Sequence, residues 1–246
     1  MGLLTVIRKQ KRRDRELRIL VLGLDNAGKT TIVRRLLGDD EAAVRQTAPT
    51  QGFCIRTKVL VSGYRMHLWD IGGQRSLRAY WRNYFERTDA LIWVLDATDP
   101  QRAREEAAAE LAALLSEPSL QQVPLLVLAN KSDLAAARPP QAIGEALGLS
   151  RPVPSSPTEG LQAPTSVPDA TAETLANSTW AQAWPAHELN QLESKRSWYL
   201  ASCSAYTGQG LDDSLNWLLQ QVTWHLYRFD SRRESVAYSL VKTLNE

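Results

Sequence analysis

Eight residues near the start of the chain, Gly23 to Thr30, read Gly-Leu-Asp-Asn-Ala-Gly-Lys-Thr and have the spacing of a phosphate-binding loop. Its glycines permit a turn whose backbone N–H groups point inward at an anion. We expect the Lys29 ammonium to reach the β- and γ-phosphates of a nucleotide and the Thr30 hydroxyl to ligate Mg²⁺. The expected phosphate contacts of the loop are Asp25, Asn26, Ala27, Gly28, Lys29, Thr30 and Thr31. An ordinary glycine-rich turn is the alternative, and the strand before the loop and the helix after it favour the nucleotide site.

A second segment, Trp69 to Gln74, carries residues suited to phosphoryl chemistry. Asp70 ends an apolar strand, which is the usual position of a carboxylate that holds Mg²⁺ through water. The Gly73 N–H is expected to meet a γ-phosphate, and Gln74 is placed to orient an attacking water. Because the segment follows a phosphate loop, we interpret it as catalytic, with Gln74 as the catalytic residue.

A third segment, Asn130-Lys131-Ser-Asp133, favours guanine over adenine. An aspartate there accepts hydrogen bonds from the N1–H and N2 amine of guanine, and adenine lacks this pair of donors. Ser204 and Ala205, which follow the last predicted strand, are expected to offer a backbone N–H to the guanine carbonyl. An Asx-rich loop without a ligand is the alternative. A nucleotide or metabolite kinase would share the phosphate loop but has no need of the base-reading segment.

The elements that position these residues alternate along the chain. Predicted strands cover 17–22, 53–61, 64–71, 90–96, 123–129 and 198–202, and predicted helices cover 31–37, 102–115 and 211–225. The second and third strands read as an antiparallel hairpin, residues 39–52 as a polar segment that ends in a loop, and 75–87 as a polar helix or loop. This alternation predicts an α/β fold: a mainly parallel sheet with helices on both faces and binding loops at the strand ends.

Composition narrows the classes of protein. A net charge of +2 over 246 residues implies no strong bulk attraction to nucleic acid or membrane, and we expect no nucleic-acid partner. Cys54 and Cys203 lie far apart, which excludes a disulfide framework. The three histidines lack metal-ligand spacing, and no apolar run is long enough to span a bilayer. We expect a reduced, soluble, cytoplasmic protein.

Taken together, these motifs resemble the small GTPases of the ADP-ribosylation-factor-like family, closest to the subgroup that releases lipidated cargo from carrier proteins. The stretches that carry the resemblance are GLDNAGKT, PTQGF, WDIGGQ, YWRNYFE, NKSD and SCSA. The resemblance implies a three-layer P-loop GTPase fold with a six-stranded sheet and one antiparallel strand. It implies that Thr50 binds Mg²⁺ and the γ-phosphate in the GTP state, and that Phe53, Trp69 and Tyr84 form a hydrophobic effector patch.

Three segments flank or interrupt the GTPase domain that we expect over residues 17–225. Residues 1–16 read as an amphipathic helix with a basic end, and a weak membrane contact through residues 3–13 is expected. We expect Gly2 to stay unmodified, because Val6 stands where a myristoylation signal needs Ser or Thr. The Pro-rich stretch 151–193 reads as an insert of loosely ordered composition, and 226–246 as a C-terminal extension.

The leading interpretation is a GTP-operated switch with slow hydrolysis that depends on an activating protein. Its cofactors are GTP or GDP and Mg²⁺, and its partners are effectors or carriers for lipidated cargo, an exchange factor and a GTPase-activating protein. Such a switch associates reversibly with membranes and acts in intracellular trafficking, with the cilium or flagellum as one compartment. The competing hypothesis is a scaffold that holds GTP constitutively. Lys29, Thr50 and Gln74 are all present, which favours the switch.

Overall fold

The computed structural model describes residues 14–149 and 196–227. The predicted N-terminal helix (1–16) and C-terminal extension (226–246) lie almost entirely outside the described residues, and the predicted insert (151–193) lies wholly outside them. No helix within the described ranges is long and apolar enough to cross a bilayer.

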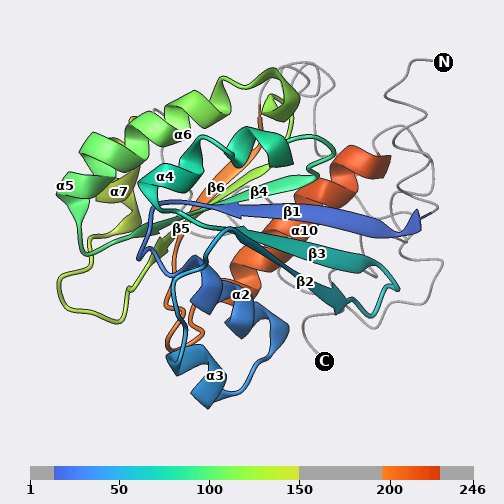
Figure 1. Ribbon diagram of the computed structural model, residues 1–246, viewed down its shortest axis with the longest axis horizontal. Helices are drawn as coiled ribbons and strands as arrows, with labels where there is room; N and C mark the ends of the chain where they lie inside the picture. The colour runs from blue at the N-terminus through green and yellow to red at the C-terminus, as the bar shows by residue number, and fades with distance from the viewer. Residues whose placement is uncertain (1–13, 150–195, 228–246) are drawn as a thin grey trace, which may run out of the picture.

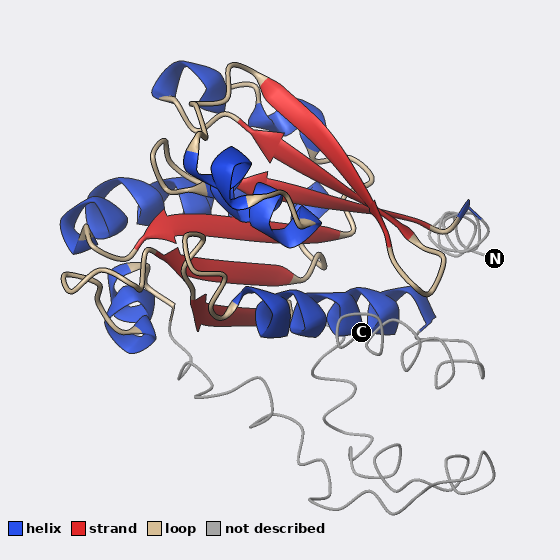
Figure 2. Cartoon of the chain, turned by 90° about the horizontal axis from the view of Figure 1, so that it is seen from below, coloured by secondary structure: helices blue, strands red, loops and turns tan. Residues whose placement is uncertain are grey.

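The described chain is built on one sheet of six strands in the order β2-β3-β1-β4-β5-β6 (Figures 1 and 2). The strands are β1 (Glu16–Leu22), β2 (Phe53–Val59), β3 (Arg65–Ile71), β4 (Ala90–Asp96), β5 (Leu125–Asn130) and β6 (Trp198–Ser202). β2 and β3 pair antiparallel, whereas every other neighbouring pair is parallel. The predicted fold class is confirmed, with β2 as the antiparallel strand at one edge.

Two hydrophobic clusters cover the two faces of the sheet. One cluster joins the sheet to α2 (Lys29–Leu37) and α10 (Leu211–Tyr227), and α10 runs along the sheet in Figure 2. The other joins it to α6 (Ala108–Leu115), α7 (Pro140–Ala146) and the 3₁₀ turn η1 (Trp81–Tyr84). β4 and β5 are buried almost throughout, as expected for central parallel strands covered on both faces. The carboxyl ends of β1, β3, β4, β5 and β6 therefore carry the polar loops that form the candidate site.

The structure differs from the sequence prediction in two local features. Residues 39–52, predicted as a polar segment that ends in a loop, contain the short helix α3 (Glu41–Arg45), which begins because the Asp40 side chain accepts a hydrogen bond from the Ala43 N–H. The predicted helix 102–115 is divided into α5 (Pro100–Arg102), a π-helical segment η2 (Ala103–Ala107) and α6. The predicted helix or loop after Gln74 consists of α4 (Arg75–Arg78) and η1.

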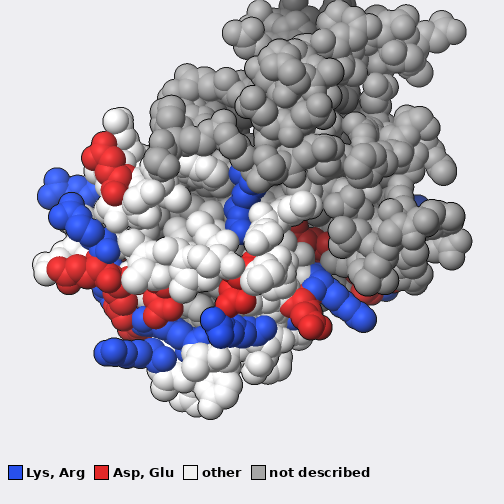
Figure 3. Space-filling model, turned by 90° about the horizontal axis from the view of Figure 1, so that it is seen from above, with Lys and Arg blue, Asp and Glu red and all other residues white. Residues whose placement is uncertain are grey.

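The face of the molecule drawn in Figure 3 carries basic and acidic side chains next to one another. No broad surface of one sign is visible on that face, in keeping with the net charge of +2. The charges that matter most for the site are paired locally, as described next.

Candidate nucleotide site

The predicted phosphate loop lies between β1 and α2. Its backbone takes positive φ angles at Gly23 (142°), Asn26 (61°) and Gly28 (93°). A Cβ on Gly23 would lie 2.0 Å from the Val94 carbonyl oxygen, so only glycine allows β1 and β4 to approach so closely there. A chain that alternates between these backbone regions turns its N–H groups into a concave surface, and the start of α2 adds the positive end of its dipole. The loop therefore has the shape of an anion site.

Lys29, at the start of α2, is the buried cation of this loop, with 6% of its surface exposed. Its ammonium donates a hydrogen bond to the Leu24 carbonyl oxygen over 2.7 Å. Burial lowers the pKa of Lys29 to about 8, although Asp70 and Asp25 favour its charged form. A phosphate beside the ammonium would offset that desolvation, so the burial of Lys29 suits an anionic ligand.

Thr30, Thr50 and Asp70 meet at one point, although they come from α2, the loop before β2 and the end of β3. The Thr30 Oγ1 lies 2.7 Å from Thr50 Oγ1 and donates to Asp70 Oδ2 over 2.7 Å, and Thr50 Oγ1 lies 3.2 Å from the same oxygen. Asp70 is 1% exposed, and among the described residues its Oδ1 has no hydrogen-bond partner. Burial raises the pKa of Asp70, while Thr30 and Lys29 oppose the rise.

These three side chains fit a hydrated Mg²⁺ ion. The magnesium ligands in proteins are hard oxygens, often one or two carboxylates or hydroxyls together with water and phosphate oxygens. The buried carboxylate oxygen that lacks a partner is the atom that a coordinated water would satisfy. Within the described parts of the chain, no three His, Cys, Asp or Glu side chains gather as an alternative metal centre.

Gly72 and Gly73 pack directly against the phosphate loop. A Cβ on Gly73 would lie 2.4 Å from the Gly23 carbonyl oxygen and 2.5 Å from the Lys29 ammonium nitrogen. The Gly72 N–H donates to the Gly52 carbonyl oxygen over 2.8 Å, which joins the segment to the loop before β2. Gln74 is exposed, and its carbonyl oxygen accepts a hydrogen bond from Leu77 in the first turn of α4.

The predicted base-reading residues lie on the loops after β5 and β6. Asn130 joins both loops to the phosphate loop, because its Nδ2 donates to the Ala27 carbonyl oxygen and its Oδ1 accepts from the Ala205 N–H. Lys131 forms an ion pair with Asp96 at 2.5 Å, and Asp133 is exposed. The Ser204 N–H donates to the Gln209 carbonyl oxygen over 3.0 Å. The Ala205 N–H points toward Asn130. A bound guanine carbonyl would share this donor with the Asn130 Oδ1.

Arg35 of α2 was not singled out by the sequence analysis, yet it holds the loop after β6. Its Nε donates to the Ala205 carbonyl oxygen over 3.1 Å, and its Nη2 makes a short hydrogen bond to the Tyr206 carbonyl oxygen. The remaining nitrogen, Nη1, pairs with Glu41 of α3 at 2.5 Å. Arg35 lies on the polar face of α2, and the fold shows that this face contacts the loop after β6.

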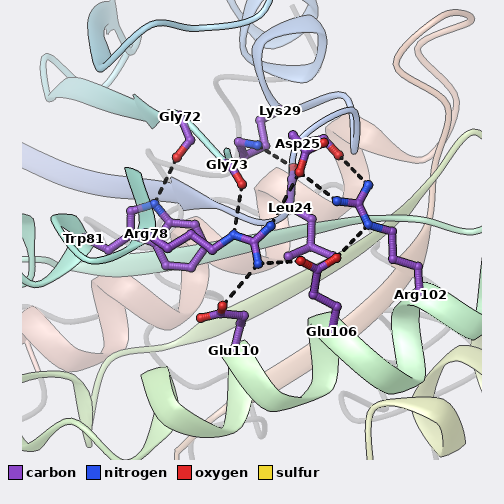
Figure 4. A network of polar contacts seen from close by, with 10 residues as sticks. All are labelled: Leu24, Asp25, Lys29, Gly72, Gly73, Arg78, Trp81, Arg102, Glu106 and Glu110. Atoms are coloured by element: carbon purple, nitrogen blue, oxygen red, sulfur yellow. Dashed lines mark hydrogen bonds and ion pairs between the residues drawn. The ribbon is translucent and has the colours of Figure 1, made fainter. Parts of the chain in front are cut away.

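Asp25 of the phosphate loop directs its carboxylate toward two arginines (Figure 4). Its Oδ1 lies 2.7 Å from Arg102 Nη2 and 3.4 Å from Arg78 Nη2. Partial burial favours the protonated acid, but the hydrogen bond and charge of Arg102 outweigh it and lower the pKa of Asp25. The loop therefore carries an ionised carboxylate whose charge is balanced by two arginines, beside the expected phosphates. The sequence motif does not predict these partners.

The predicted effector patch forms one aromatic cluster on β2, β3 and η1. The Phe53 ring centroid lies 6.1 Å from that of Trp69 and 5.3 Å from that of Tyr84, and the Trp69 and Tyr84 centroids are 6.0 Å apart. Phe53 is 50% exposed. Arg18 of β1 stacks on the Trp69 ring, with its guanidinium carbon 3.7 Å from the centroid, and its Nη2 donates to the Tyr84 carbonyl oxygen over 3.0 Å.

This fold and this site define a P-loop protein of the small GTPase class. Residues 3–222 match the model of the ADP-ribosylation factor family. The chain belongs to the ADP-ribosylation factor family. It is 37% identical over 230 residues to ADP-ribosylation factor-like protein 2 of Arabidopsis thaliana and 36% identical over 230 residues to that of Dictyostelium discoideum, covering in each case 94% of this chain and 100% of the relative.

A solved structure with a similar fold is that of the Arl6 BBS3 small GTPase of Trypanosoma brucei with a bound nucleotide analogue, GppNp. The similarity has a TM-score of 0.59 at 21% sequence identity and covers 85% of this chain and 99% of that one. At this identity the likeness concerns the fold alone.

Proposed function

We propose that the chain is a GTP-operated switch of the Arf-like type that releases lipidated cargo from carrier proteins. The observation that carries this proposal is the continuity between the candidate magnesium site and the aromatic cluster. Gly52 lies between Thr50 and Phe53, and its carbonyl oxygen accepts a hydrogen bond from the Gly72 N–H. A ligand that holds Thr50 would therefore also hold the edge strand that presents Phe53, and its loss would release both.

The proposed assignment gives each site residue one role. Asp25, Asn26, Ala27, Gly28, Lys29, Thr30, Thr31, Thr50 and Gly73 bind the phosphates, and Asn130, Lys131, Asp133, Ser204 and Ala205 bind guanine. Thr30, Thr50 and, through water, Asp70 would hold Mg²⁺, which would offset negative charge on the phosphate oxygens. Gln74 accepts a hydrogen bond from the attacking water and orients it toward the γ-phosphate.

The proposed hydrolysis is slow without an activating protein. Arg78 of α4 contacts the phosphate loop at Asp25, and its guanidinium is committed to Glu106, Glu110 and Asp25. An arginine that stabilises the transition state contributes about 10³–10⁵-fold to the rate. With Arg78 bound in this way, the proposal assigns that contribution to a partner.

The proposal for lipidated cargo is supported by the similarity to ADP-ribosylation factor-like protein 2. The proposed partners of this chain are carriers or other effectors that bind the aromatic cluster, an exchange factor and an activating protein. Residues 3–13 supply the weak, nucleotide-gated membrane contact, and Gly2 carries no lipid. The proposed location is cytoplasmic, with reversible membrane association and the cilium or flagellum as one compartment. The 17–225 domain, the 151–193 insert and the 226–246 extension remain the proposed division of the chain.

Single-turnover hydrolysis of GTP, measured with and without cell extract and beside nucleotide exchange, tests the switch. We expect slow hydrolysis alone, clear stimulation by extract, and preference of a captured effector for the protein loaded with a GTP analogue. Tight GTP binding with negligible turnover in both conditions would instead support the constitutive scaffold. Release of a fluorescent prenylated peptide from a carrier fraction, dependent on the GTP analogue, tests the cargo.

A further inference from the structure

Arg78 is a buried arginine in the network of Figure 4, with 6% of its side chain exposed. Its Nη1 lies 2.7 Å from Glu106 and 3.1 Å from Glu110, both on the helix formed by η2 and α6. A buried arginine that lost these carboxylates would keep an uncompensated charge, so the ion pairs fix the guanidinium in place. Arg78 thereby ties α4 to a helix that does not belong to the nucleotide site.

Two side chains hold the two peptide planes that meet at Gly73. Trp81 Nε1 donates to the Gly72 carbonyl oxygen over 3.0 Å, and Arg78 Nε donates to the Gly73 carbonyl oxygen over 3.0 Å. A peptide bond is planar, so the Gly72 carbonyl and the Gly73 N–H point in opposite directions from one plane. Trp81 therefore sets the direction of the Gly73 N–H, and Arg78 sets that of the next plane, which carries the Gln74 N–H.

Gly73 needs this support because glycine itself restricts the backbone least of all residues. The close approach of Gly73 to Gly23 and to the Lys29 ammonium excludes a larger residue. The conformation at Gly73 is thus held from outside, by side chains farther along the same segment, and not by its own side chain.

Arg102 closes the network onto the phosphate loop. Its Nε pairs with Glu106 at 2.8 Å, and its other nitrogens reach the carboxylate and the carbonyl oxygen of Asp25. Glu106 is therefore shared between the arginine that holds Gly73 and the arginine that holds the loop. One carboxylate on η2 thus links the Gly73 segment to the phosphate loop.

We propose that Arg78, anchored by Glu106 and Glu110, is a positioning residue that enables Gly73 to distinguish a triphosphate from a diphosphate. The inference rests on the proposed function, in which the Gly73 N–H donates to the γ-phosphate. A diphosphate has no atom at that position, so its affinity does not depend on Gly73. Loss of the Arg78 anchor lowers the affinity for a triphosphate and leaves that for a diphosphate unchanged.

The test compares Arg78→Ala with Arg75→Ala, a matched control on the exposed side of α4. Dissociation constants are measured for GDP and for a non-hydrolysable GTP analogue, both with excess Mg²⁺. We expect Arg78→Ala to weaken the analogue roughly tenfold or more relative to GDP, the scale of one hydrogen bond to a charged group, and Arg75→Ala to keep the wild-type ratio. A merely structural role predicts that both affinities fall together.

A second variant guards against misfolding of Arg78→Ala. Glu110→Gln keeps the pairs of Glu106 with Arg78 and Arg102 but removes a charge that contacts Arg78 at 3.1 Å, and we expect the same selective loss on a smaller scale. An unchanged ratio of the two affinities in the folded variants, or an equal loss of both, overturns the proposal. Wild-type protein that binds neither nucleotide overturns the proposed function instead, which separates the two failures.

Discussion

The side-chain hydroxyls of Thr30 and Thr50 lie 2.7 Å apart, although a whole helix and a loop separate them in the chain. Thr30 is fixed in the first turn of α2, whereas Thr50 lies on the loop before the edge strand β2. Only one of the two hydroxyls is therefore held by regular structure independently of the ligand. This asymmetry is the physical basis of the first prediction.

We expect Thr50→Val and Thr30→Val to have different effects. Valine keeps the shape of threonine and removes the hydroxyl, so each variant loses one of the proposed metal ligands. Thr50→Val is expected to weaken the GTP analogue about tenfold and to leave GDP unaffected, whereas Thr30→Val weakens both. Magnesium titrations with each nucleotide measure the effect. Equal losses in the two variants would contradict a role for Thr50 that is confined to the triphosphate.

Asp133→Asn is expected to shift base preference from guanine to xanthine. Asp133 is exposed on the loop after β5, where its carboxylate is free to accept from N1–H and the N2 amine. An asparagine donates instead and suits the O2 of xanthine, and mispaired polar groups cost about 1–3 kcal/mol, or roughly 5- to 150-fold. Competition between GTP and XTP checks the change. Equal preference in wild type and variant would refute the assignment of Asp133.

Gln74→Leu is expected to leave GTP binding intact and to abolish stimulated hydrolysis. Gln74 is exposed at the start of α4, so its replacement removes no buried packing. A residue that positions water contributes about 10²–10⁴-fold to the rate. Lys29→Ala is the contrasting variant, since it removes a phosphate ligand and should weaken binding itself. Stimulated hydrolysis at the wild-type rate in Gln74→Leu would remove this role.

Arg18→Ala is expected to lower the free energy of unfolding by about 2 kcal/mol. The variant loses the contact with the Trp69 ring and a charged hydrogen bond to the Tyr84 carbonyl oxygen. Arg65→Ala is the control, because Arg65 pairs with Glu16 at the surface and such pairs contribute about 0–1 kcal/mol. Urea denaturation measures both. If the two variants are equally stable, Arg18 does not support the aromatic cluster.

The two cysteines are expected to react differently with a thiol reagent. Cys54 on β2 is exposed, whereas Cys203 is fully buried and burial raises its pKa to about 12. A thiol with this pKa is almost entirely protonated at pH 8, and the thiolate is the reactive form. We expect one equivalent of label on native protein at pH 8 and two after unfolding. Labelling of native Cys54→Ser protein would show that the β6 loop opens.

The sequence predicted the sheet because its central strands are continuous apolar runs, and such runs are stable only when they are buried on both faces. It missed α3, whose five residues carry no helical periodicity and depend on the Asp40 cap. It named the residues that we assign to the ligand: the motifs of the phosphate loop, of Asp70 to Gln74 and of Asn130 to Asp133 have a spacing that ligand chemistry requires, and Thr50 came from the resemblance to the family. It did not predict the roles of Arg18, Arg35 or Arg78. The partners of these arginines lie far away in the sequence and come close only in the folded chain.

The strand order has a consequence for where this protein can be labelled. The described chain stops at Leu149 and resumes at Arg196, just before β6, while Phe53 lies on β2 at the opposite edge of the sheet. Arg196 is held there by the carbonyl oxygens of Leu115 and Leu120. Arg196 therefore lies at the edge of the sheet opposite the aromatic cluster. A fluorescent domain fused next to Arg196 would thus be attached at the sheet edge opposite Phe53, and we expect it to allow the protein to be followed in cells.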